Sequence, residues 1–66
     1  MKPICENVSV QLSGEDGNAF FIIGRVTKAM KLVNVENATI DAFTSEAMSG
    51  DYDHLLQVCM KYVDVS

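Results

Sequence analysis

The sequence predicts a small α+β domain of β-α-α-α-β order, with helices packed on one face of a two-stranded sheet. Three observations lead to this fold class. Apolar and polar residues alternate near both ends of the chain, which is the period of a half-buried strand. Between these ends, apolar residues recur at helical spacing. The chain has 66 residues, so we expect a single domain, 1–66, without linker or repeat.

The first strand is expected over residues 7–12, where three apolar residues alternate with polar ones. Residues 13–18 combine Ser, Gly, Glu, Asp and Asn, a composition typical of a turn. Asn18 or Asp16 can cap the element that follows, because a short polar side chain accepts a bond from an orphan helix N–H group.

Residues 19–33 form the longest periodic stretch and predict an amphipathic helix. An alternative is that residues 19–23, which are rich in aromatic and β-branched side chains, form the second strand of a hairpin. We favour the helix because its apolar arc continues past Gly24 without a change of phase. The arc consists of Ala19, Ile22, Ile23, Val26, Ala29, Met30 and Val33.

A second helix is expected over residues 38–49, capped by Asn37 and ended by Gly50 at the position after the C-cap. Its inward face should contain Ile40, Phe43, Thr44, Ala47 and Met48.

A short third helix, 52–57, should begin after a cap at Asp51. Residues 60–65 alternate again and predict the closing strand.

Charge and hydropathy exclude several classes of protein. Nine acidic against five basic side chains give a net charge of −4, and the longest apolar run, 19–23, is far shorter than the roughly 20 residues of a membrane span. The first residues lack the apolar segment of a secretory signal. We therefore expect a cytoplasmic protein without membrane contact, in which Cys5 and Cys59 are free thiols rather than one disulfide.

Asp51, His54 and Cys59 are the candidates for an enzyme or metal site. His54 is the only histidine. On a helix only Asp51 and His54, three residues apart, share a face, whereas zinc sites use three or four protein ligands. We therefore expect no catalytic residue, no metal site and no cofactor.

The most informative pattern is a mixed basic and apolar stripe on the first predicted helix. Phe21, Arg25, Lys28 and Leu32 follow the spacing i, i+4, i+7, i+11, with Lys31 at the rim. This helix carries three of the five basic residues. The stripe is either a partner-binding face or a solvated face whose two apolar residues are covered by lysine stems and neighbouring elements.

Two segments, residues 16–26 and 46–56, resemble a family of very small uncharacterised proteins of bacteriophages, prophages and their bacterial hosts. The family pattern pairs a GNAF…G helix start with an SGDYDHLL…V.V ending, and the resemblance covers about residues 10–65. It implies a phage or mobile-element origin, a cytoplasmic setting and a helix rather than a hairpin at 19–23. It implies no activity and no functional residues.

These observations predict a non-enzymatic protein-interaction module, a phage or prophage accessory protein. Its expected partner is a host protein or a second copy of the chain in a homodimer. The alternative is a small nucleic-acid-associated regulator that uses the same basic helix face. The net charge of −4 argues against this alternative, because non-specific nucleic-acid binding depends on several phosphate contacts.

Overall fold

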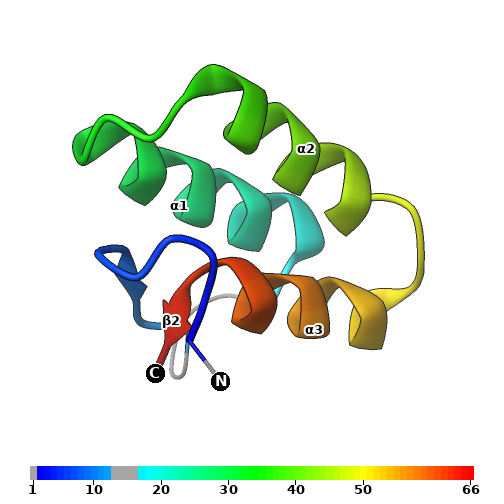
Figure 1. The fold of residues 1–66 in the computed structure, drawn as a ribbon. Coiled ribbons are helices and arrows are strands. Elements are labelled where there is room, and N and C mark those ends of the chain that lie inside the picture. The colour runs from blue at the N-terminus through cyan, green and yellow to red at the C-terminus, as the bar shows by residue number, and fades with distance from the viewer. Residues whose placement is uncertain (1, 13–16) are drawn as a thin grey trace.

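The computed structural model of the chain describes residues 2–12 and 17–66 and confirms the predicted α+β class and β-α-α-α-β order (Figure 1). The predicted cap at Asp16 and most of the predicted turn lie outside these residues. The elements are β1 (Ser9–Val10), α1 (Ala19–Leu32), α2 (Asn37–Ala47), α3 (Tyr52–Tyr62) and β2 (Asp64–Val65).

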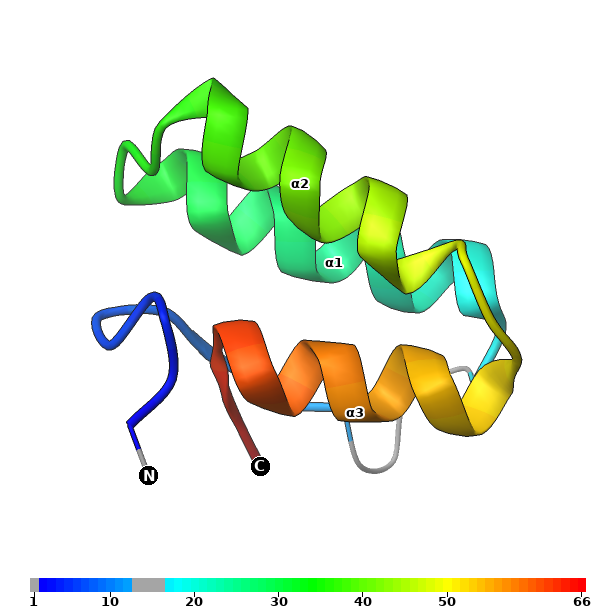
Figure 2. The same ribbon diagram turned by 45° about the vertical axis from the view of Figure 1, so that its right-hand side comes forward.

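The helices α1 and α2 lie side by side in opposite directions, and α3 runs beneath them (Figures 1 and 2). The small sheet lies beside the end of α3, where the N-terminal segment meets the C-terminal one (Figure 1). Strand β1 contacts α1 and strand β2 contacts α3, and Gln11, directly after β1, accepts a bond from Arg25 of α1.

The two strands pair in parallel, with Ser9 opposite Asp64 and Val10 opposite Val65. Val10 is buried against the helices, whereas Ser9 and Asp64 are exposed and their side chains hydrogen-bond at 3.3 Å. The sheet therefore has one apolar face, which the helices cover, and one polar face.

The first strand is shorter than the predicted range 7–12. Single backbone bonds extend the pairing beyond it, since the N–H of Asp64 donates to Val8 and the N–H of Leu12 donates to Ser66, both over 2.9 Å. The predicted apolar alternation holds, with Val8 buried and Leu12 half-buried.

Residues 19–23 are helical, so the hairpin alternative is wrong. The side chain of Asn18 accepts a bond from the N–H of Phe20 over 2.9 Å, as the predicted cap requires. At the other end Asn34 adopts a left-handed conformation with φ of 61°. The N–H of Val35 then returns to the carbonyl of Met30 over 3.0 Å, a Schellman-type end that satisfies a helix carbonyl.

The second helix begins and ends earlier than predicted. Asn37 is its first residue and not its cap, because Glu36 takes the cap position without a side-chain bond. The helix ends at Ala47, so Met48 leaves the inward face and is 57% exposed. Gly50 consequently lies beyond the position of a C-terminal cap glycine.

The third helix is longer than predicted and runs through Tyr62, which makes the predicted strand 60–65 wrong over its first half. Asp51 caps this helix as expected, accepting from the N–H of His54 over 2.9 Å. The helix continues because its apolar residues keep helical spacing and reach the core. The buried residues of α3 are Leu55, Val58, Cys59 and Tyr62.

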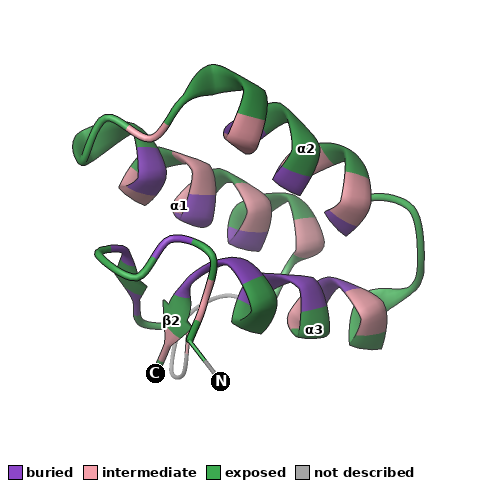
Figure 3. Ribbon diagram, viewed as in Figure 1, coloured by how far each residue is buried: buried purple, intermediate pink, exposed green. Residues whose placement is uncertain are grey.

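The core lies between α1, α2, α3 and the sheet (Figure 3). Phe43 is fully buried and meets the ring of Tyr62 edge to face, with centroids 5.4 Å apart. The buried turns of α1 and α2 face α3, and their exposed turns face outward (Figure 3). In α1 the inward residues are Ile22, Val26 and Met30.

Within the described residues, no helix has both the length and the apolar character needed to cross a bilayer. Cys5 and Cys59 are both buried as free thiols, as predicted.

Candidate interaction face

The outer side of α1 presents a mixed apolar and basic surface. All five predicted contact residues lie away from the buried side of this helix, and Leu32 is 76% exposed and Phe21 42% exposed. The alternative in which neighbouring elements cover both apolar residues is therefore wrong for Leu32. We call this surface the α1 face and add two residues that share its side of the helix. It consists of Phe20, Phe21, Gly24, Arg25, Lys28, Lys31 and Leu32.

Two hollows adjoin along the α1 face. The first has a volume of about 300 Å³ and lies between the aromatic pair Phe20 and Phe21 and the cations Arg25 and Lys28, with Gly24 between them. The second, of about 240 Å³, lies between α1 and β1. Its lining is Ser9, Val10, Gln11, Arg25, Lys28, Ala29 and Leu32. Arg25 and Lys28 line both hollows, so the two meet at these side chains, and we call them together the α1 groove.

Arg25 is half-buried and ties the groove to the sheet. Its Nε donates to the backbone carbonyl of Gln11 over 3.0 Å. This bond fixes Nε of the Arg25 guanidinium and holds Gln11, the residue after β1, beside α1. Arg25 therefore shapes the groove, whereas Lys28 and Lys31 are exposed cations.

The charge of the molecule is strongly divided. Helix α1 carries three basic and no acidic side chains, a charge of +3. The rest of the chain carries nine acidic and two basic side chains, a charge of −7, which accounts for the net charge of −4. The groove along α1 is therefore basic, whereas the rest of the protein is acidic.

Phe20 is an exposed residue of the α1 face that the predicted stripe does not include. It is 74% exposed, four residues before Gly24 and eight before Lys28, so helical spacing alone could have placed it on the same side. It also borders a separate apolar cavity of about 240 Å³ between the ends of the three helices. Met48 and Tyr52 lie at this cavity, 57% and 45% exposed.

The structure does not bring Asp51, His54 and Cys59 into one site. Asp51 serves as the cap of α3, and Cys59 is fully buried in the core. Burial raises the pKa of the Cys59 thiol to about 11, so the nucleophilic thiolate is scarce at neutral pH.

His54 instead joins α3 to the end of α2. Its Nε2 lies 2.9 Å from the backbone carbonyl of Glu46 and 3.2 Å from the hydroxyl of Ser49. That hydroxyl donates to the same carbonyl over 2.7 Å. The ring thus acts as a helix cap from outside the helix, a structural role.

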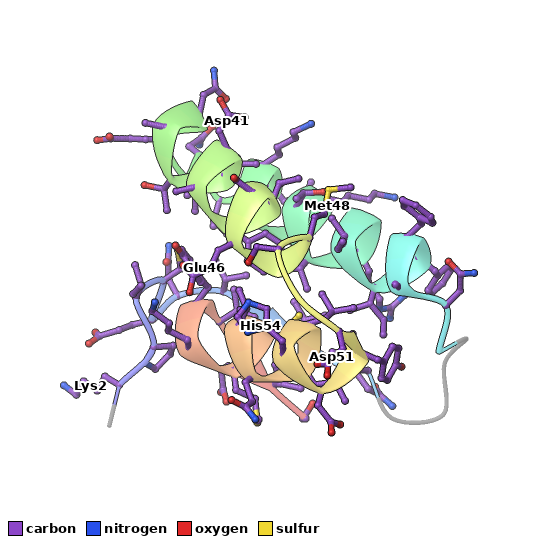
Figure 4. The ribbon with its side chains drawn as sticks, turned by 90° about the vertical axis from the view of Figure 1, so that its right-hand side faces the viewer. Lys2, Asp41, Glu46, Met48, Asp51 and His54 are labelled. Atoms are coloured by element: carbon purple, nitrogen blue, oxygen red, sulfur yellow. The ribbon has the colours of Figure 1, made fainter. Side chains whose placement is uncertain are left out.

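Glu46, which lies outside the predicted inward face of the second helix, bridges α2 and α3. Its carboxylate accepts from Nζ of Lys61 over 2.8 Å and from the hydroxyl of Tyr62 over 3.1 Å. These bonds, that of Lys61 first, lower the pKa of Glu46 below its usual value. Figure 4 shows Glu46 and His54 near each other between the two helices, while Met48 and Asp51 lie at the helix ends that the connecting segment joins.

Across residues 2–12 and 17–66, no three His, Cys, Asp or Glu side chains gather where they could hold a metal ion.

No protein-family model matches the chain, and neither the curated proteins nor the solved structures contain a significant match. The resemblance to small phage proteins therefore stays a prediction.

Proposed function

We propose that this chain is a non-enzymatic protein-interaction module that contacts its partner through the α1 face. One observation carries the proposal: exposed aromatic and aliphatic side chains stand beside the cations of a helix that bears no acidic residue. Phe20 and Leu32, each about three-quarters exposed, leave apolar surface in water at both ends of the groove. Exposed apolar surface with a polar rim is typical of protein contacts.

A protein partner suits this face better than a nucleic acid. Only three cations lie on it, and the guanidinium of Arg25 already bonds the carbonyl of Gln11. The charge of −7 on the rest of the chain opposes the approach of a polyanion. The nucleic-acid-associated regulator remains the second candidate, because exposed aromatic rings beside lysines also stack on single-stranded bases.

Two further expectations belong to the same proposal. The resemblance supports a phage or prophage origin, in which the partner is a protein of the bacterial host. A cytoplasmic location is consistent with two free buried thiols.

The test is an affinity capture from bacterial lysate, with and without nuclease, read by mass spectrometry. Lys28→Glu changes an exposed lysine on the α1 face. Lys2→Glu is the matched control, because it makes the same change of charge at a lysine whose side chain is 85% exposed near the N-terminus.

We expect a bacterial protein that survives nuclease and Lys2→Glu but is lost with Lys28→Glu. Capture that disappears with nuclease would favour the nucleic-acid regulator. Equal capture by both variants would place the contact elsewhere on the molecule.

A further inference from the structure

We infer that the groove along α1 receives an acidic amphipathic segment of a partner protein, with one apolar side chain over Gly24 and carboxylates at Lys28 and Lys31. This inference rests on the proposed function and names the chemistry of its partner. It follows from the division of charge, from the open backbone at Gly24 and from the order of side chains along the helix.

Charge selects an acidic partner. The α1 face carries no carboxylate of its own, so its cations are not neutralised within the helix. A second copy docked face to face would oppose two such +3 helices, which is unfavourable. A short foreign segment with two or three carboxylates removes this repulsion and complements Lys28 and Lys31. It meets less repulsion from the charge of −7 on the rest of the chain than a polyanion does.

Gly24 marks where an apolar side chain enters. A Cβ placed on Gly24 would meet nothing within 4 Å, so no packing contact within the described chain requires glycine there. Glycine nevertheless costs a helix about 1 kcal/mol relative to alanine. Its lack of a side chain opens the hollow of about 300 Å³ between Phe20 and Lys28. On the same measure one water molecule needs about 10–15 Å³, so this open hollow has room for a side chain.

The order of residues along α1 determines the spacing between the apolar side chain and the carboxylates of the partner segment. Phe20 and Phe21 precede the hollow, and Lys28 and Lys31 follow it toward the C-terminal end. The distance from Gly24 to Lys31 is about 10 Å along the helix axis, or about two turns. Lys28 lies only about 6 Å from Gly24 on the same axis. The partner segment therefore carries its acidic residues about 6 to 10 Å from its apolar anchor, whether it binds as a helix or as an extended strand.

The experiment selects ligands from a displayed library of random linear peptides on the immobilised full chain. We expect enriched peptides to combine Asp or Glu with an aromatic or aliphatic residue, and to bind less tightly as salt rises. Synthetic copies are then titrated against variants whose fold is checked by circular dichroism.

Two variants distinguish the contribution of charge to peptide binding from that of the hollow at Gly24. Lys28→Glu should weaken the peptides about tenfold or more, while Lys2→Glu leaves them within about twofold. Gly24→Leu should fill the hollow and weaken them by a similar factor without loss of helix. Its matched control is Ala42→Leu, which adds the same side chain at an exposed position of α2.

Several results would overturn the inference. One is the enrichment of basic or uncharged peptides. Another is that Gly24→Leu and the wild type bind the selected peptides equally well. A third is that the chain binds an oligothymidylate more tightly than any acidic peptide. Dimerisation of the wild type that Gly24→Leu abolishes would assign the groove to a second copy. The affinity capture could recover a protein that Lys28→Glu loses, while the peptide selection enriches no acidic peptide. That result would support the proposed function and reject this inference alone.

Discussion

The imidazole of His54 fills the space that a side chain on Gly50 would need. A Cβ built on Gly50 would lie 2.7 Å from both Cγ and Cδ2 of the ring and 2.8 Å from the Cβ of His54. The ring cannot withdraw freely, because its Nε2 is bonded to the carbonyl of Glu46 over 2.9 Å. Gly50 is thus needed for the close approach of α3 to the end of α2.

Gly50→Ala should therefore destabilise the protein. The added methyl group meets the root of the His54 side chain, so the backbone or the ring must shift, at a cost of about 1–3 kcal/mol. Urea unfolding monitored by circular dichroism measures the loss. If Gly50→Ala is as stable as the wild type, the close packing of His54 on Gly50 is wrong.

Gly24→Ala should have the opposite effect on stability. The new methyl group enters open space on an exposed turn of α1 and improves helix propensity, which adds up to about 1 kcal/mol to the free energy of unfolding. Urea unfolding of Gly24→Ala and Gly50→Ala under the same conditions compares their free energies of unfolding with that of the wild type. A loss of stability in Gly24→Ala would mean that a contact at this position, within the chain or with a second copy, needs glycine.

Glu46→Gln should remove stability near neutral pH but not in acid. Bonds from Lys61 and Tyr62 hold the folded pKa of Glu46 below its ordinary value of 4.5. The ionised carboxylate therefore contributes stability above pH 4.5, and this contribution is lost as the pH falls through the lower folded pKa. Unfolding midpoints of the two proteins should differ near neutral pH and converge in acid; a constant gap would contradict the ion-pair account.

The thiol of Cys59 should react with iodoacetamide far more slowly in the folded than in the unfolded protein. Burial raises its pKa from the ordinary 9.0 to about 11, so both access and the thiolate fraction fall. Because the unfolded thiol ionises first, its contribution to stability is present below pH 9 and declines as the pH rises toward 11. Mass spectrometry of pulse-labelled protein checks the rate, and fast labelling of Cys59 in the native state would contradict its burial.

Local chemistry made the helix starts predictable. Asn18 and Asp51 cap α1 and α3 because each is a short polar residue directly before the first helical residue, and this signal depends only on neighbouring residues. The same local signal gave a wrong prediction at Asn37. An asparagine before an apolar segment is not the cap when the helix begins one residue earlier, as α2 does after Glu36.

The sheet was harder to predict. Residues 60–62 alternate as a strand would, yet Tyr62 also continues the helical spacing of Leu55 and Val58, and contact with Phe43 decides for the helix. The register of Ser9 with Asp64 joins residues 55 positions apart, which no local pattern specifies. The predicted stripe on α1 was found by periodicity, whereas Phe20 was left out of both the predicted stripe and the predicted apolar arc, although it lies one turn before Gly24.

Amide chemical shifts of the isotope-labelled protein show whether α1 provides the contact face. The protein recovered by affinity capture is titrated into the isotope-labelled chain. If α1 provides this face, the shifts will concentrate from Phe20 to Leu32 and at residues 9–11, with little change near Ile4 and Met60, which are also exposed and apolar. Shifts centred on Ile4 and Met60, with α1 unchanged, would contradict this assignment.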